Sequence, residues 1–203
     1  MAAAGVVGLS GWHLPAVARI VASGAADGAP APTPRLTDGP FYPPAFPSSP
    51  TPSLIAGPMH PEARPLRLSG RVVDQVGRPV GGSRIEIWQC DALRRYHHPA
   101  DGRGEGRDAG FRGFGWQASA ADGSYAFETI RPVAYPGRTP HIHVKVKVDG
   151  RAVLTSQIFM PDERDANARD FLWRSLGNGQ PLALATVQRR GDGETARFDL
   201  VLG

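Results

Sequence analysis

From residue 67 onward, hydrophobic and polar residues alternate in short stretches that are separated by glycine, proline and aspartate. The clearest stretch covers residues 141–148 (HIHVKVKV), in which isoleucine and valine occupy every second position. Because successive side chains of a strand point to opposite faces, a period of two predicts a β-strand with one buried face. The same argument predicts further strands at residues 68–74, 84–89, 124–129, 154–159, 182–189 and 196–202.

Turn residues and the remaining segments complete this picture. Asp122 and Gly123 precede the stretch that contains Tyr125 and Phe127, which predicts a β-hairpin whose aromatic side chains join the core. Residues 99–115 are rich in glycine and predict a long loop, and residues 165–176 predict one short helix. Many short strands joined by turns are typical of an antiparallel β-sandwich, so we predict a mostly β fold with long loops.

The first 66 residues do not share this alternation. Residues 1–35 predict a signal-like segment or a flexible tail, because they begin with small apolar residues and contain the APA pattern of a cleavage site. A basic start is missing, so both interpretations stay open, and with them export or a cytoplasmic location. Residues 36–66 carry many prolines and predict an extended arm that lies over the rest of a domain spanning residues 36–203.

Composition and charge exclude several classes of protein. The one cysteine, Cys90, leaves no disulfide within the chain and no CxxC metal motif. No apolar run is long enough for a membrane span. The net charge is +4, but the 23 basic residues are scattered, so we predict no nucleic-acid partner. A homo-oligomer stays open, because the proline-rich arm could cover a neighbouring copy.

Two histidines stand two residues apart in the predicted strand at residues 141–148. The alternation places His141 and His143 on one face, together with Lys145 and Lys147. Such a face is commonly solvated, so the histidine pair alone is a weak signal for a metal site.

Tyr96 and Tyr135 strengthen this signal, because they add two oxygen ligands. An ordinary tyrosine has a pKa of about 10, so its phenolate forms at pH 7 only beside a highly charged cation. Two phenolates and two imidazoles suit Fe(III), whereas the lack of thiols disfavours a zinc site of cysteines.

Several stretches of the chain match the motifs of one family in their order. They are residues 36–42 (LTDGPFY), 68–74 (LSGRVVD), 85–89 (IEIWQ), 95–98 (RYHH), 122–127 (DGSYAF), 135–136 (YP), 138–143 (RTPHIH) and 155–157 (TSQ). Each stretch alone is a weak signal, but the ordered set is specific. From about residue 36 to the C-terminus, the chain resembles the intradiol ring-cleavage dioxygenases, the family of protocatechuate 3,4-dioxygenase and catechol 1,2-dioxygenase.

The resemblance implies a set of site residues and a reaction. The metal ligands would hold Fe(III) and are Tyr96, Tyr135, His141 and His143. The catalytic residues would be Tyr135, Arg138 and Gln157, and the substrate would be bound by Thr37, Gly39, Pro40 and Arg138. The implied reaction uses O2 to cleave a catechol-type diol to a cis,cis-muconate-type diacid.

Two features depart from the best-known members of the family. Only five residues separate Tyr135 from His141, and Phe41 stands where some members have tyrosine. The short spacing leaves the identity of the catechol open. Another interpretation is a non-catalytic binding module, because residues 70–80 and 122–127 also fit transthyretin-like and carboxypeptidase-regulatory-like domains. An iron site of two histidines and one carboxylate is disfavoured, because no acid lies within five residues before His141.

Overall fold

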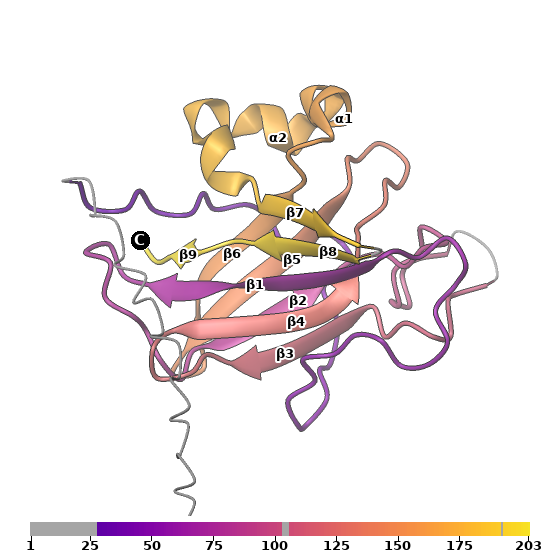
Figure 1. Ribbon diagram of the computed structural model, residues 1–203, viewed down its shortest axis with the longest axis horizontal. Coiled ribbons are helices and arrows are strands. Elements are labelled where there is room, and N and C mark those ends of the chain that lie inside the picture. Colours follow the sequence, from indigo (N-terminus) through magenta and orange to yellow (C-terminus); the bar gives the residue numbers. More distant parts are fainter. Residues whose placement is uncertain (1–27, 103–105, 192) are drawn as a thin grey trace, which may run out of the picture.

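The computed structural model describes residues 28–102, 106–191 and 193–203, and it shows two β-sheets packed face to face (Figure 1). The mostly β fold predicted from the sequence is therefore confirmed, and the few helices are short. Most of the predicted signal-like or flexible tail, residues 1–35, lies outside the described residues.

The first sheet has the strand order β4-β1-β8-β7, and β9 pairs with the end of β1. Its strands are β1 (Pro65–Val73), β4 (Ser124–Ile130), β7 (Thr186–Arg190), β8 (Gly193–Arg197) and β9 (Leu200–Val201). The second sheet has the order β3-β2-β5-β6, and its strands are β2 (Arg84–Trp88), β3 (Phe114–Ala118), β5 (His141–Val148) and β6 (Arg151–Phe159). The pairs of β1 with β8 and β9 are parallel, so the predicted sandwich is not antiparallel throughout.

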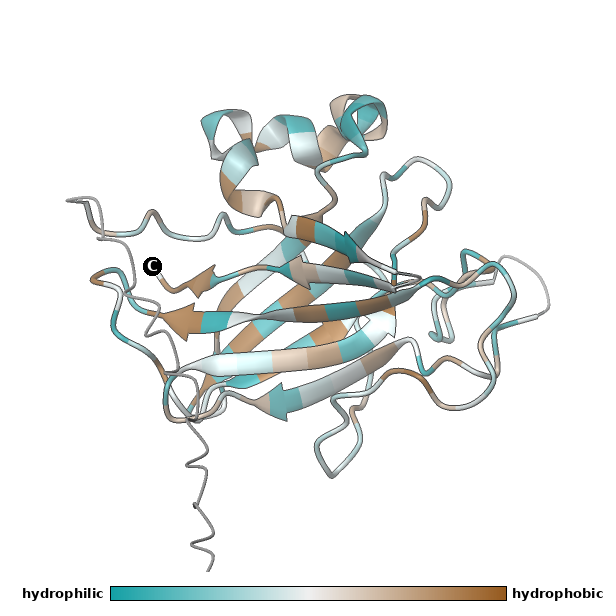
Figure 2. Ribbon diagram, viewed as in Figure 1, coloured by the Kyte–Doolittle hydropathy of each residue, from teal (hydrophilic) through white to brown (hydrophobic). Residues whose placement is uncertain are grey.

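The two sheets bury alternate side chains against each other, as the period of two predicts. Leu68 and Phe127 of the first sheet and Ile85, Val144 and Ile158 of the second are fully buried. Figure 2 shows hydrophobic and hydrophilic residues alternating along these strands. Each fully buried side chain of this size stabilises the fold by about 2 kcal/mol. The core therefore fixes the strand ends from which the loops described below depart.

The single helix predicted over residues 165–176 is two short helices, α1 (Arg164–Arg169) and α2 (Phe171–Ser175). Asp170 separates them with an extended backbone (φ −75°, ψ 128°), and its side chain caps the N-terminus of α2. Figure 1 shows both helices at one side of the sandwich, and the ring of Trp173 in α2 packs against Phe159 of β6 at 5.1 Å between centroids.

Two other boundaries differ from the sequence prediction. The 3-10 helix η1 (Gly177–Ala183) occupies the start of the predicted strand at residues 182–189, so this strand begins only at Thr186. The predicted loop at residues 99–115 ends where β3 begins at Phe114. Glycines in and around β3 obscure its alternation, so pattern alone does not reveal the strand.

The proline-rich arm contains no helix and is held by backbone hydrogen bonds to both sheets. Leu36 donates to the carbonyl of Thr155 in β6 at 2.9 Å, and Leu54 donates to the carbonyl of Glu128 in β4 at 2.8 Å. Leu54 is also fully buried and joins the core, whereas the sequence predicts an arm that only covers it. Leu54 therefore helps to anchor the arm against the sandwich, together with Ile55 and Ala63, which pack against the same core.

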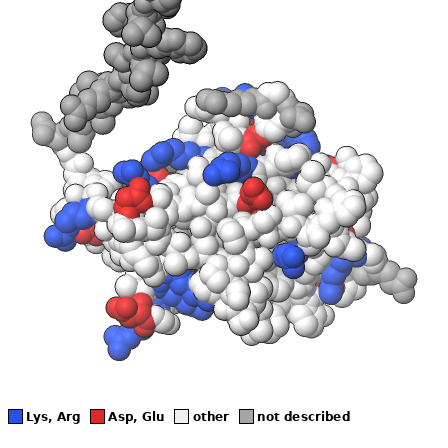
Figure 3. Space-filling view, turned by 60° about the horizontal axis from the view of Figure 1, so that its bottom comes forward, with Lys and Arg blue, Asp and Glu red and all other residues white. Residues whose placement is uncertain are grey.

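Charged side chains of both signs are mixed over the surface. Figure 3 shows this mixture on the face in view, with no continuous basic stripe there. Several arginines pair with nearby carboxylates, for example Arg78 with Asp74 at 2.7 Å and Arg197 with Asp199 at 3.1 Å. In the part of the chain that the structure describes, no helix has the length and apolar character needed to cross a bilayer.

Candidate metal centre

His141 and His143 project from the same face of β5 into one buried space. Each residue is 2% exposed, and their Nε2 atoms lie 3.2 Å apart. This burial excludes the alternative of a solvated face for the pair. Burial lowers the pKa of His141 to about 3 and that of His143 well below its usual value, and the charge of Arg138 acts in the same direction. Both imidazoles are therefore neutral at pH 7 and offer nitrogen lone pairs.

A backbone carbonyl selects the tautomer of His141. Its Nδ1 lies 2.7 Å from the carbonyl oxygen of Thr139 and must carry the proton in order to donate. Its Nε2 therefore keeps a lone pair and faces Tyr96 Oη at 3.4 Å as well as His143 Nε2. The ring of His143 stacks on Trp88 at 4.7 Å, and its buried Nδ1 has no hydrogen-bond partner within the described residues. Trp88 is thus a core residue that also orients His143.

Tyr96 reaches the histidines from the loop that follows β2. It is 2% exposed, and two carboxylates hold its loop: Asp101 accepts from the N–H of Tyr96 at 2.7 Å, and Asp91 accepts from the preceding N–H at 2.9 Å. The ring of Phe41, from the arm, stacks on Tyr96 at 4.7 Å. Because backbone and ring are both fixed, the phenol oxygen is directed toward His141.

Tyr135 enters from the loop between β4 and β5. A tight turn forms there, in which the N–H of Arg138 donates to the carbonyl of Tyr135 at 2.9 Å and Gly137 takes a positive φ of 81°. The ring of Tyr135 lies 5.4 Å from that of Tyr96 and 5.8 Å from that of His141, measured between centroids. Tyr135 is only half-buried, so it forms the solvent side of the group.

The donor atoms of three predicted ligands, Tyr96, His141 and His143, have spacings that suit one metal ion, and the ring of Tyr135 lies beside them. Two ligands bound at about 2.1 Å and separated by about 100° lie about 3.2 Å apart. The contacts of His141 Nε2 with His143 Nε2 and Tyr96 Oη, at 3.2 and 3.4 Å, match this spacing. The described residues contain no group of three or more His, Cys, Asp or Glu that could hold a metal, so they offer no site of two histidines and one carboxylate. Phenol and imidazole donors fit Fe(III) best.

Arg138 and Gln157 lie directly beside the four ligands, as the sequence predicts. Gln157 is fully buried and pairs with His143 across β5 and β6. Its Oε1 accepts from Arg138 Nη2 at 2.5 Å, and its Nε2 donates to the carbonyl of Thr37 at 3.4 Å. Arg138 Nη1 lies 3.4 Å from Tyr135 Oη. The guanidinium is therefore held next to the most exposed of the four ligands.

The arm brings Thr37 and Gly39 to the same region. Gly39 has a φ of 70°, and a Cβ added to it would lie 3.5 Å from His143 Cε1. The positive φ favours glycine here, whereas a contact of 3.5 Å with the imidazole is ordinary van der Waals packing. Thr37 and Pro40 are exposed, which places them at the rim.

Comparison with known proteins decides the family. A family model described as Dioxygenase (Dioxygenase_C) matches residues 37–203. The chain belongs to the intradiol ring-cleavage dioxygenases. It is 38% identical over 104 residues to the protocatechuate 3,4-dioxygenase beta chain of Burkholderia cepacia, which covers 47% of this chain and 44% of that protein. It is 31% identical over 139 residues to catechol 1,2-dioxygenase of Candida albicans, which covers 60% and 45%, respectively.

Solved structures of the family share the fold of this chain. The dioxygenase domain of a dioxygenase carbohydrate-binding protein fusion from Streptomyces sp. SirexAA-E is 36% identical, with a TM-score of 0.66 over 85% of this chain and 98% of that one. An intradiol ring-cleavage dioxygenase from Tetranychus urticae is 20% identical, with a TM-score of 0.72 over 85% and 95%. The chain spans about half the length of the curated relatives it matches.

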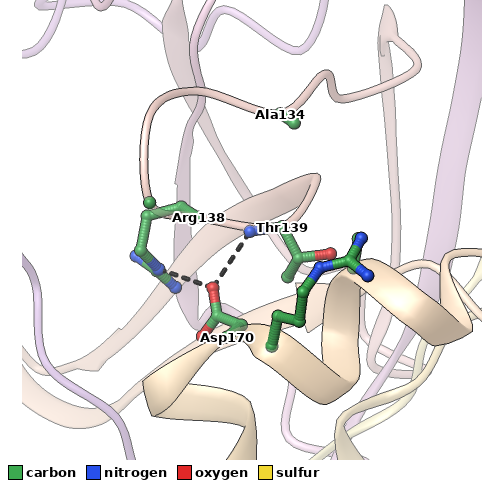
Figure 4. A pocket seen from close by; sticks show the side chains of 7 residues that line it. Ala134, Arg138, Thr139 and Asp170 are labelled. Atoms are coloured by element: carbon green, nitrogen blue, oxygen red, sulfur yellow. Dashed lines mark hydrogen bonds and ion pairs between the residues drawn. The ribbon is translucent and has the colours of Figure 1, made fainter.

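Sequence reasoning misses two residues that support the candidate site. Asp170 accepts from Arg138 Nε at 2.8 Å and from the N–H of Thr139 at 3.0 Å, as Figure 4 shows. Asn167 accepts from the hydroxyl of Thr139 at 2.7 Å. An aspartate before a short apolar stretch is a typical helix N-cap, so the sequence does signal the start of α2. Nothing in that pattern signals a contact with Arg138.

Asp170 is ionised and fully enclosed at this position. Burial alone would raise its pKa, but hydrogen bonds from the backbone of Thr139 and Trp173 and from the Arg138 guanidinium hold the pKa below its usual value. A cavity of about 360 Å³ opens beside it, lined in part by Ala134, Arg138 and Thr139 (Figure 4). The carboxylate therefore links the helices to the loop that carries Tyr135.

Proposed function

We propose that this chain is a non-haem, Fe(III)-dependent dioxygenase that opens the ring of a catechol-type diol between its two hydroxyl-bearing carbons. Both atoms of O2 enter the product, a cis,cis-muconate-type diacid. The observation that carries the proposal is the convergence of two phenols, from Tyr96 and Tyr135, with the neutral imidazoles of His141 and His143. Membership of the family supports it, because the matched region includes all four residues.

Tyr96, Tyr135, His141 and His143 would hold the ferric ion. When bound, this ion supplies the Lewis acidity that makes a chelated catechol reactive toward O2. The two imidazoles are neutral, so the negative charge that the chain offers comes from the two phenols once they are deprotonated.

The chain's own residues would act on the substrate side of the site. Tyr135 Oη is half-buried and lies beside Arg138, where its phenolate can take a proton from an incoming catechol hydroxyl. The Arg138 guanidinium stabilises the negative charge that develops on the ring when O2 adds. Gln157 and Asp170 hold it in place beforehand, so little reorganisation is needed during the reaction.

Colour and ring opening test this proposal together. Protein loaded with iron in air should show a visible charge-transfer band from tyrosinate to Fe(III). It should also convert at least one of catechol, protocatechuate, hydroxyquinol and 3-chlorocatechol to a diacid, followed by ultraviolet absorbance. These four diols appear in the names of the relatives and of one similar solved structure.

Two tyrosine variants make the test specific. Tyr135→Phe should weaken the band and slow turnover about a hundredfold or more, because a ligand and a base are lost. Tyr125→Phe is the matched control, since that phenol lies in the core and donates to the carbonyl of Phe198 at 2.6 Å. It should change neither property. A colourless wild-type protein that opens none of the four rings would overturn the proposal and favour a non-catalytic binding module.

A further inference from the structure

The carboxylate of Asp170 accepts four hydrogen bonds at the junction of α1 and α2. Its Oδ1 accepts from the N–H groups of Leu172 and Trp173 at 2.9 and 3.0 Å. Its Oδ2 accepts from Arg138 Nε at 2.8 Å and from the N–H of Thr139 at 3.0 Å. The side chain is 0% exposed, so water does not share in this set.

Capping of α2 explains only half of these bonds. An N-cap needs one side-chain oxygen for the free N–H groups of its helix, and serine, threonine or asparagine serve as well as aspartate. Oδ1 alone fulfils this role in Asp170. Burial of a full charge is costly unless a partner compensates for it, and the partner here is Arg138. A charged residue at this position is therefore explained by the guanidinium rather than by the helix.

Asp170 is one of three residues that contact the nitrogen atoms of the Arg138 guanidinium. Gln157 binds Nη2 from β6, Asp170 binds Nε from the helices, and Nη1 is left toward Tyr135 Oη at 3.4 Å. Thr139, the next residue, is held by the same carboxylate, and its carbonyl accepts from His141 Nδ1 at 2.7 Å. One side chain thus touches the supports of both the arginine and a histidine ligand.

We propose that Asp170 is a positioning residue of the dioxygenase site, which fixes the direction of the Arg138 guanidinium beside Tyr135. This inference rests on the proposed function for its catalytic consequence. Asp170 acts through Arg138 and touches neither the diol nor the metal ligands directly. Without its Oδ2, Nε of Arg138 loses its partner, and the guanidinium can swing toward the cavity beside it or toward the exposed ring of Phe171, 5.5 Å away.

A double-mutant cycle separates positioning from capping. Asp170→Asn keeps an oxygen for the cap but presents an amide N–H to the two donors of Arg138 and Thr139. In the wild-type background it should lower kcat about 10- to 100-fold with little change in KM. In an Arg138→Ala background the same change should lower kcat less than about threefold, because the residue through which it acts is gone. Asp165→Asn, an exposed acid in the first turn of α1, is the control and should leave kcat unchanged.

A second variant leaves the helix cap intact. Arg138→Lys keeps the positive charge but removes the planar donor fork that Asp170 and Gln157 bind. Its kcat should fall at least about tenfold if direction matters. Full activity of Arg138→Lys would overturn the proposal, as would an equal loss from Asp170→Asn in both arginine backgrounds.

A readout independent of activity distinguishes failure of this inference from failure of the proposed function. In the full chain without added iron, the Arg138 Nε–H should give an NMR signal protected from solvent exchange, assigned by its loss in Arg138→Lys. Asp170→Asn should abolish this protection, whereas Asp165→Asn should keep it. Protection that persists in Asp170→Asn refutes the positioning role even when the wild-type enzyme is active. Protection that is lost supports it even when no tested diol is cleaved.

Discussion

One face of β5 carries polar side chains at both of its ends, and the partners of these side chains differ between the two ends. His141 and His143 occupy one end of this face, and Lys145 and Lys147 occupy the other. All four alternate with the same core residues, and the arm covers both ends. Sequence pattern alone treats them as one polar face, yet their partners differ completely.

At the lysine end, both ammonium groups form ion pairs with carboxylates of the same chain. Lys145 Nζ pairs with Asp38 at 2.7 Å, and Lys147 Nζ pairs with Glu86 at 3.0 Å. Tyr42 donates to the same glutamate at 2.7 Å, and the Lys145 ammonium lies 3.8 Å from the centroid of its ring. Each lysine therefore has an opposite charge from the protein, which compensates for the partial loss of water around the pair.

At the histidine end, no described carboxylate hydrogen-bonds to either imidazole. The two Nε2 atoms face each other, and that of His141 also faces the phenol of Tyr96, so electron-pair donors gather there. The nearest cation, Arg138, is already bound by Asp170 and Gln157. Comparison of the two ends teaches that a polar cluster completed by the chain is structural. A cluster of electron-pair donors without an ion-pair partner is instead what a metal site requires, which agrees with the iron centre proposed above.

Loss of a histidine ligand is the strongest way to break this comparison. His141→Ala should abolish the visible band and reduce ring opening at least about a hundredfold, because it removes one of four ligands. Lys147→Met, at the other end of the face, should keep both, since Glu86 retains Arg84 and Tyr42 as partners. Iron content per chain and initial rates measure the contrast. Normal iron content in His141→Ala would remove His141 from the ligand set.

Loss of the carboxylate at the lysine end should instead affect stability. Glu86 has a fully buried side chain and binds Arg84 and Lys147, so Glu86→Gln leaves two cations without their partner. Breaking a buried pair costs several kcal/mol, but both cations are partly exposed, so we expect a loss of about 2 kcal/mol. Denaturant unfolding should show this loss, with iron content unchanged. Loss of iron without loss of stability would reverse the roles of the two ends.

The pH dependence of stability should also report the contribution of Glu86. Burial would raise the pKa of Glu86, but hydrogen bonds from Arg84, Tyr42 and Lys147 lower it below the ordinary value of 4.5. Below pH 4.5 the unfolded chain takes up a proton that the folded chain does not, so this contribution is present above pH 4.5 and is lost as the pH falls through the lowered pKa. Unfolding measured from pH 6 to 3 should therefore show a smaller decline in Glu86→Gln than in the wild type. Equal declines would show that Glu86 titrates alike in both states.

The sequence predicts most of the strands and the grouping of four candidate ligands, because both depend on local patterns. Period-two alternation places His141 and His143 on one face, and the tyrosines lie in family motifs. The prediction of the helix over residues 165–176 fails at Asp170, whose side chain favours a cap over a continuous helix.

Long-range pairings account for what pattern does not predict. Asp170 lies 32 positions from Arg138, and Asp38 lies 107 positions from Lys145. Neither distance leaves a period or a motif in the chain, because each pair depends on how loops from separate segments meet. The division of one strand face into a histidine cluster and an ion-pair cluster is therefore a property of the tertiary fold.

The smallest effect is expected from Lys145→Met, a change at the lysine end that should be felt at the histidine end. Lys145→Met removes the partner of Asp38, which stands between Thr37 and Gly39 in the arm. Because Asp38 is 39% exposed, water can replace the lysine, and the loss of stability should stay below about 1 kcal/mol. The arm would be held less firmly beside His143, so KM for the diol should rise about threefold while kcat and the visible band stay unchanged. The matched variant Lys147→Met should change KM less, since Tyr42 of the arm keeps its hydrogen bond to Glu86 of β2 at 2.7 Å when its contact with Lys147 is lost. A fall in kcat at constant KM in Lys145→Met would mean that the arm positions reacting groups instead of substrate, and the two ends of the face would then share one function.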